Sequence, residues 1–226
     1  MQSPLIPRTT RTDNRIIRLA VPEDAVALGH IQAASHQATY AGIMPDSILV
    51  RLSAERLIER FRSRLNASAE AHLAPVVASP NRLWVVHVNG AVAGYAATQP
   101  GASTFLPPPH GAGEIESLYL HPDAKGLGLG RALHQHAIDD LVARGFGPLV
   151  LWAFAANRQA LRFYERAGWV LDKAGENWVL DGVACPIVRY RLPVARSATA
   201  STGPTIDAQK RGVPGSRPRQ IRPETT

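Results

Sequence analysis

Several short segments of the chain are rich in β-branched and aromatic residues and are bounded by turn residues, which is typical of β-strands. Residues 16–20 (IIRLA), 82–88 (RLWVVHV) and 91–98 (AVAGYAAT) show this pattern. The last two segments are joined by Asn89-Gly90, a dipeptide that favours a two-residue hairpin turn because both of its residues adopt positive φ. The sequence therefore predicts an antiparallel hairpin near the middle of the chain.

Other segments repeat apolar residues every three or four positions, which is the period of an amphipathic helix. Residues 53–65 (SAERLIERFRSRL) begin with Ser53, a good N-cap, and place apolar side chains on one face at Leu57, Phe61 and Leu65. A second helix is predicted from about Glu23. Its apolar face would comprise Val26, His30, Ile31 and Ala34.

In the second half of the chain, strands alternate with helices. A strand at 114–120 (EIESLYL) precedes a helix that ends near Arg144, with Leu133, Ala137 and Leu141 facing inward. Strands that first form a hairpin and then alternate with helices predict an α/β or α+β fold around a mixed sheet.

The next strand is predicted at 148–154 (PLVLWAF), a continuous apolar run. Asn157 caps the helix that follows, and Gly168 terminates it. Two strands near 169–171 and 187–192 complete the sheet, with residues 178–180 as a further strand or loop edge.

The net charge of +7 is concentrated in the ends of the chain. Residues 1–18 and 197–226 each carry +3, whereas residues 19–196 hold 16 basic and 15 acidic side chains. The segment from 197 onward is rich in Ser, Thr, Pro and Arg and poor in large apolar residues, so it is predicted to be disordered. We therefore expect a flexible segment at 1–14, one domain at 15–196 and a basic tail at 197–226. A nearly neutral domain argues against nucleic acid as its partner.

Cys185 is the single cysteine, so neither a disulfide framework nor a Cys-rich metal site is expected. His134 and His136 are two residues apart on a predicted helix and so point in different directions, and no other spacing fits a metal. No apolar run is long enough to span a membrane, and residues 1–15 do not resemble a secretory signal. A reducing compartment, the cytoplasm, is the expected location.

The segment after the 114–120 strand has the composition of an anion cradle. It reads HPDAKGLGLGR from His121 to Arg131, and a helix follows. Glycines allow backbone N–H groups to approach an anion, and the helix N-terminus adds partial positive charge. The dinucleotide pattern GxGxxG fails because Arg131 occupies the third glycine position, and no Gly-Lys-Ser/Thr of a P-loop is present.

The spacing Lys125-x-x-Gly128-x-Gly130 resembles the pyrophosphate loop of the GNAT superfamily of acyl-CoA N-acyltransferases, where Gln or Arg usually stands at the first position. A second segment, from Asn157 to Trp169, resembles the family's N-x-x-A-x-x-F-Y-x-x-x-G-[FW] motif. Residues 40–45 (YAGIMP) are similar to a segment near the acceptor site in small members of the family, in which Trp often replaces His36.

This resemblance implies the GNAT fold: a twisted, mostly antiparallel mixed sheet of about six or seven strands, flanked by about four helices. It also implies acetyl-CoA as the acetyl donor, with no metal, bound where two neighbouring strands splay apart. The implied cofactor-binding residues are Leu118, Tyr119, Leu120, Lys125, Gly126, Leu127, Gly128, Leu129, Gly130, Arg131, Asn157, Ala160 and Tyr164.

The resemblance also implies the roles of individual side chains. Tyr164 would protonate the departing thiolate, and Glu114 or Glu116 would accept the amine proton, directly or through water. Strict alternation along the strand would place both carboxylates on one face, with Leu118 and Leu120. The implied acceptor-binding residues are Tyr40 and His36.

The resulting hypothesis is an acetyl-CoA-dependent N-acetyltransferase that acts on a small amine, a protein N-terminus or a lysine through a ternary complex. Two alternatives stay open: a CoA-binding regulatory module without turnover, and a nucleic-acid-associated protein that uses its basic tails. Both Asn157 and Tyr164 are present, which disfavours the first alternative. Homodimers formed by pairing edge strands are common in the family, and a homodimer here stays open as well.

Overall fold

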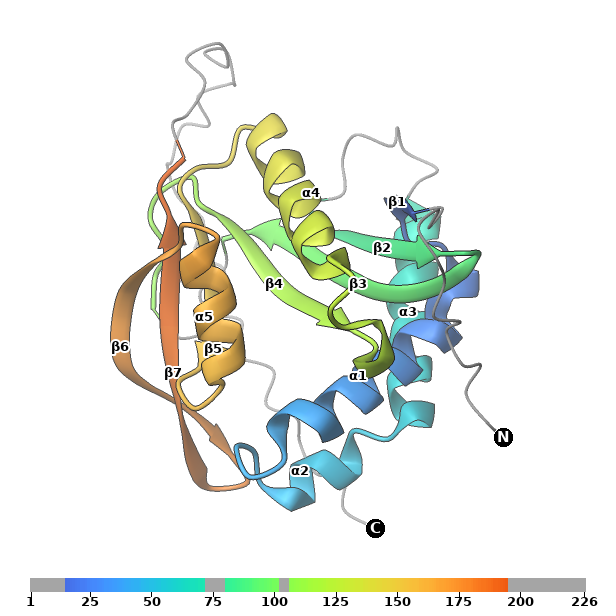
Figure 1. The fold of residues 1–226 in the computed structure, drawn as a ribbon, viewed down its shortest axis with the longest axis horizontal. Helices are drawn as coiled ribbons and strands as arrows, with labels where there is room; N and C mark the ends of the chain where they lie inside the picture. Colours follow the sequence, from blue (N-terminus) through green and yellow to red (C-terminus); the bar gives the residue numbers. More distant parts are fainter. Residues whose placement is uncertain (1–14, 72–79, 102–105, 195–226) are drawn as a thin grey trace, which may run out of the picture.

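The computed structural model describes residues 15–71, 80–101 and 106–194, which form one seven-stranded sheet with helices on both faces. The strand order is β1-β2-β3-β4-β5-β7-β6 (Figure 1). The strands are β1 Arg15–Leu19, β2 Arg82–Val88, β3 Ala91–Pro100, β4 Gly113–Leu120, β5 Leu149–Phe154, β6 Val170–Leu180 and β7 Val183–Leu192. The helices are α1 Ala25–Tyr40, α2 Asp46–Arg51, α3 Ala54–Ala71, α4 Leu129–Ala143 and α5 Arg158–Arg166, with short 3-10 turns at Pro22–Asp24 and Pro122–Ala124.

Parallel pairing occurs between β4 and β5, while the other neighbouring strands of the sheet are antiparallel. The parallel pair is short, because it includes only Gly113 with Leu149 and Glu114 with Val150. Beyond Glu114 the two strands separate, although β4 continues to Leu120 and β5 to Phe154. The expected mixed sheet that splays between neighbouring strands is therefore confirmed.

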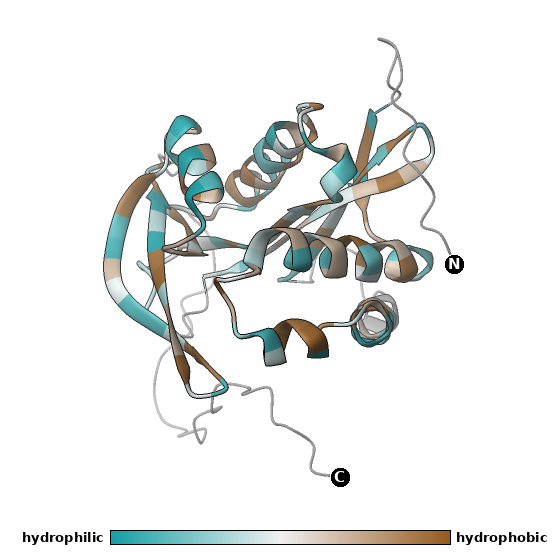
Figure 2. Ribbon diagram, turned by 60° about the horizontal axis from the view of Figure 1, so that its bottom comes forward, coloured by the Kyte–Doolittle hydropathy of each residue, from teal (hydrophilic) through white to brown (hydrophobic). Residues whose placement is uncertain are grey.

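Two apolar layers hold the helices against the sheet (Figure 2). On one face, α4 contributes Leu133, Ala137 and Leu141, all fully buried, as predicted from the sequence. On the other face, α1 and α3 pack on β2 and β3, and the predicted face of α3 (Leu57, Phe61 and Leu65) is buried. A third cluster, between α2 and the β6–β7 hairpin, includes Met44, Ile48, Leu180 and Ile187.

The apolar face predicted for α1 is wrong at Val26 and His30, which are exposed, and right at Ile31. The buried face instead runs through Ala25, Leu28 and Gly29. At Gly29 an added Cβ would lie 2.4 Å from a side-chain atom of Ile58 on α3. Small residues let the two helices approach closely, so the larger Val26 is turned outward.

The hairpin turn at Asn89-Gly90 is confirmed, since both residues have positive φ. The strands predicted at 169–171, 178–180 and 187–192 are too short. Residues 170–180 form one continuous strand, which turns at Asp181-Gly182 into β7. The strand β6 lies at the sheet edge and is mostly exposed, so its apolar residues do not follow the periodicity of a buried face.

Helix α2 was not predicted from the sequence. The segments 1–14 and 197–226, expected to be flexible and disordered, lie outside the described residues, so the proposed domain limits remain predictions. No helix in the described parts of the chain combines the length and apolar character needed to cross a membrane.

Candidate active site

The glycine-rich turn leads from the splayed end of β4 into α4. Gly126 and Gly128 have φ of 84° and 75°, and Gly128 is the N-cap residue of α4. The side chain of Leu129, the next residue, is fully buried in the core and anchors the turn. A left-handed N-cap exposes the first N–H groups of the helix, so the turn has the geometry of an anion cradle.

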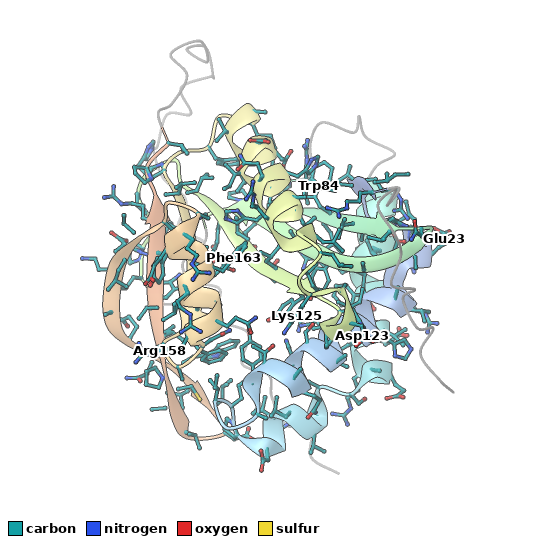
Figure 3. All side chains as sticks on the ribbon, viewed as in Figure 1. Glu23, Trp84, Asp123, Lys125, Arg158 and Phe163 are labelled. Carbon is teal, nitrogen blue, oxygen red and sulfur yellow. The ribbon has the colours of Figure 1, made fainter. Side chains whose placement is uncertain are left out.

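A cavity of about 720 Å³ follows the splay from this cradle to α5 and α1. Thirteen of the residues selected from the sequence line it: Tyr40, Glu116, Leu118, Tyr119, Leu120, Lys125, Gly126, Gly128, Gly130, Arg131, Asn157, Ala160 and Tyr164. Figure 3 labels two of the lining residues, Lys125 beside the cradle and Phe163 on α5.

Four of the selected residues lie outside the described lining, namely His36, Glu114, Leu127 and Leu129. Leu129 is fully buried and Leu127 packs against the same core, so both support the cradle from behind. The lining also contains residues that were not selected from the sequence, among them Ser35, Trp152, Arg162 and Arg166. The two arginines are four residues apart on α5, and this helical spacing is the signal that could have identified them.

The edge of β4 presents backbone groups to the cavity. The N–H of His121 donates to the carbonyl of Ala93, 2.9 Å away, and Leu120 lies opposite Gly94 in the register. In an antiparallel ladder, bonded and non-bonded pairs alternate, so the N–H and C=O of Leu118 and Leu120 point away from β3. The carbonyl of Leu120 accepts from the hydroxyl of Ser35 on α1 at 2.6 Å.

Helix α5 places Asn157 and Tyr164 along the cavity. The Oδ1 of Asn157 accepts from the N–H of Ala160 at 3.1 Å, which confirms the predicted cap. This bond uses only the carbonyl oxygen, so the amide nitrogen can still donate to a ligand. Burial raises the pKa of Tyr164 above its ordinary value, and Tyr40 raises it further, so the hydroxyl keeps its proton at neutral pH.

Two tyrosines and one histidine meet at the end of the cavity near α1. The hydroxyls of Tyr40 and Tyr119 are 3.3 Å apart, and burial raises the pKa of both. The His36 ring contacts both tyrosine rings, with centroids 5.3 and 5.2 Å away. Burial lowers the pKa of His36 to about 4, so its ring is neutral and supports Tyr40 from outside the lining.

The two candidate carboxylates are in different environments. A β-bulge in the β3–β4 ladder pairs Ile115 with Thr98 and Ser117 with Ala97, which leaves Glu116 without an opposite residue. Strict alternation therefore fails at this position. Glu116 lines the cavity and accepts from Arg64 at 2.9 Å, whereas Glu114 is buried and accepts from Gln99 at 3.2 Å.

The bulge also changes which residues lie with Glu114. Leu118 and Leu120 pack against the core that contains Ile115, the neighbour of Glu114, so they lie on the opposite face from Glu114. The expectation that Glu114, Leu118 and Leu120 share one face is therefore wrong.

The described residues contain no group of three or more His, Cys, Asp or Glu side chains that could hold a metal ion. Of the charged side chains near the cradle and on α5, those that line the cavity are cationic: Lys125, Arg131, Arg162 and Arg166. Glu116 is the one carboxylate in the described lining. The cavity can thus hold an anion at one end and an amine at the other.

Comparisons with known proteins agree with this geometry. The model of the "Acetyltransferase (GNAT) family" matches residues 49–169, more than half of the chain. A mycothiol acetyltransferase from Beutenbergia cavernae is 41% identical over 91 residues, which cover 40% of this chain and 29% of that protein. The chain therefore matches less than a third of the length of this relative.

Two solved structures share the fold. The PaiA N-acetyltransferase from Thermoplasma acidophilum, in complex with coenzyme A, has a TM-score of 0.59 and 19% identity, covering 78% of this chain and 98% of that one. YncA from Salmonella typhimurium, described as a putative acetyltransferase with its cofactor acetyl-CoA, has a TM-score of 0.57 and 21% identity, covering 81% and 96%.

The splayed mixed sheet and the glycine-rich cradle define the class of this protein as a mixed α/β fold with a cavity beside the splayed strands. More specifically, it belongs to the acetyltransferase (GNAT) family.

Proposed function

We propose that this protein transfers the acetyl group of acetyl-CoA directly to a primary amine within a ternary complex. The observation that carries the proposal is the single cavity that joins the glycine cradle, the splayed edge of β4 and Tyr164. The acceptor would be a small-molecule amine, a protein N-terminus or a lysine. Acetyl-CoA supplies a reactive thioester, and the residues of the chain bind it and move protons.

The cavity fits the chemistry of coenzyme A. The N–H groups at the start of α4, with Lys125 and Arg131, would hold the diphosphate. At Gly130 an added Cβ would lie 3.3 Å from a side-chain atom of Leu120, so a larger residue would crowd the passage from the cradle to β4. The backbone N–H and C=O of Leu118 would pair with the amides of the pantetheine arm, and Asn157 would donate to the same arm.

The reaction requires a neutral amine and a protonated leaving thiol. Glu116 would accept a proton from the amine, directly or through water, and the amine nitrogen would then bond to the thioester carbonyl carbon. The N–H of Leu120 would donate to the oxyanion that develops there. As the carbon–sulfur bond breaks, Tyr164 would donate its proton to the sulfur, and the nitrogen would lose its second proton, which restores the phenol. The products are an acetylated amine and free CoA.

The assignment of the base can be tested with a matched pair of variants. Glu116→Gln should lower kcat by about 100-fold, because it removes the carboxylate that faces the cavity. Glu114→Gln should leave kcat close to that of the wild type, because Glu114 lies outside the described lining. The measurement is amine-dependent release of CoA thiol over a panel of primary amines and peptide N-termini, with acetyl-CoA and amine varied together.

Intersecting double-reciprocal lines, with release only when an amine is present, are the expected result. Tight binding of acetyl-CoA without release for any amine in the panel would instead favour the regulatory alternative. A loss of kcat in Glu114→Gln with normal turnover in Glu116→Gln would contradict the assignment of Glu116 as the base.

A further inference from the structure

Helix α5 carries Asn157 at its cap and Tyr164 within it, and it packs against the core through Leu161 and Tyr164. Although all nine of its residues are described, none is buried. At its C-terminal end, the hydroxyl of Tyr190 on β7 donates to Glu165 at 2.7 Å. Directional contacts near the C-terminal end of α5 therefore help to set the position of Tyr164 relative to the cradle.

One of these contacts connects α5 to α4. Trp169, which follows the terminating Gly168, is 2% exposed, and its indole N–H donates to Nε2 of His134 at 2.9 Å. The backbone N–H of Trp169 donates to the carbonyl of Tyr164 at 3.0 Å. Two hydrogen bonds, one from the side chain and one from the backbone of Trp169, therefore link α4 to Tyr164.

His134 is well placed to act as the fixed end of this chain. It lies on α4, the helix whose N-terminus forms the cradle, and it is 2% exposed. Its ring contacts those of Phe163 and Tyr164, with centroid distances of 5.3 and 6.0 Å. Burial lowers the pKa of His134 to about 4, so Nε2 has a lone pair for the indole N–H at neutral pH.

We propose that His134 is a positioning residue, which sets the place of the Tyr164 hydroxyl relative to the cradle through its hydrogen bond with Trp169. The proposal rests on the role of Tyr164 as the acid in the proposed function. An error of about 1 Å in the position of a catalytic group can lower a rate severely, whereas binding along the rest of the cavity would change little. His134 touches neither substrate nor reacting atoms in this account.

The test compares Trp169→Phe, which removes the N–H donor together with part of the buried indole, with His134→Phe and His134→Gln. Trp169→Phe and His134→Phe should each lower kcat by about tenfold while the Kd for acetyl-CoA stays unchanged. His134→Gln should restore part of the rate, because its side-chain carbonyl can accept the indole N–H. His136→Phe is the matched control: the same substitution on the same helix, at a ring that contacts Trp84 instead, should leave kcat unaffected.

The decisive comparison repeats His134→Phe in a Tyr164→Phe background. If His134 acts through Tyr164, the His134→Phe substitution should cause no further loss of kcat in the Tyr164→Phe background. A further tenfold loss in that background, or normal kcat in Trp169→Phe, would overturn the proposal. These outcomes are distinct from failure of the proposed function itself, which would appear as an undiminished kcat in Tyr164→Phe alone.

Discussion

Replacing Tyr164 by Phe should lower kcat by about 100-fold or more, because general acid catalysis contributes rate factors of this size. The substitution removes one oxygen from a ring that lines the cavity, so the ring's packing remains. The KM for acetyl-CoA should stay the same, since the hydroxyl acts on the leaving sulfur after binding. Steady-state kinetics with acetyl-CoA and a saturating amine measure both constants.

Tyr190→Phe is the matched control for this prediction: it removes a phenol that holds α5 through Glu165, so kcat should fall by at most about tenfold, well short of the loss in Tyr164→Phe. Tyr190 is buried, its ring centroid is 6.5 Å from that of Tyr164, and it lies outside the described lining. Burial and Glu165 raise its pKa to about 12, so both variants remove a protonated phenol. Equal losses of kcat in the two variants would mean that the effect is structural and would exclude Tyr164 as the acid.

Replacing Gly128 by Ala should weaken the binding of acetyl-CoA by about tenfold. Gly128 has φ of 75°, where a Cβ costs roughly 1–2 kcal/mol. The nearest atom to such a Cβ is 3.7 Å away, so space is adequate and the cost lies in the backbone. The turn would relieve the strain by shifting the N–H groups of the cradle. A bound diphosphate needs these groups in place, so its binding would weaken. Isothermal titration calorimetry with acetyl-CoA measures the effect.

Gly175→Ala provides a control with the same backbone strain at a different place. Gly175 has φ of 88° in β6, and an added Cβ would meet nothing within 4 Å. Both variants should lose a similar amount of stability, but only Gly128→Ala should raise the Kd. A normal Kd in Gly128→Ala would place the diphosphate outside this turn.

The cradle and the helix caps could be predicted from the sequence because glycine and asparagine act on the backbone next to them. Gly126 and Gly128 adopt positive φ where the motif requires it, and Asn157 caps its own helix. The hairpin at Asn89-Gly90 was predictable for the same reason. Each of these features depends on residues close together in the chain.

Features that depend on distant residues could not be predicted in this way. The bulge at Glu116 arises from pairing between β3 and β4, and it decides which carboxylate reaches the cavity. Val26 is turned outward because Gly29 packs against Ile58 on another helix. The sequence spacing puts Arg162 and Arg166 on one face of a helix, but only the fold shows that this face lines the cavity.

Thermal unfolding with and without acetyl-CoA tests the central claim most directly, with CoA and ATP as controls. A ligand at 100 times its Kd should raise the free energy of unfolding by about 2.7 kcal/mol. We expect a large stabilisation by acetyl-CoA and by CoA, and none by ATP, because the cavity joins a diphosphate cradle to an edge that suits a pantetheine arm. No stabilisation by acetyl-CoA at millimolar concentration would contradict the assignment of this cavity as the acetyl-CoA site.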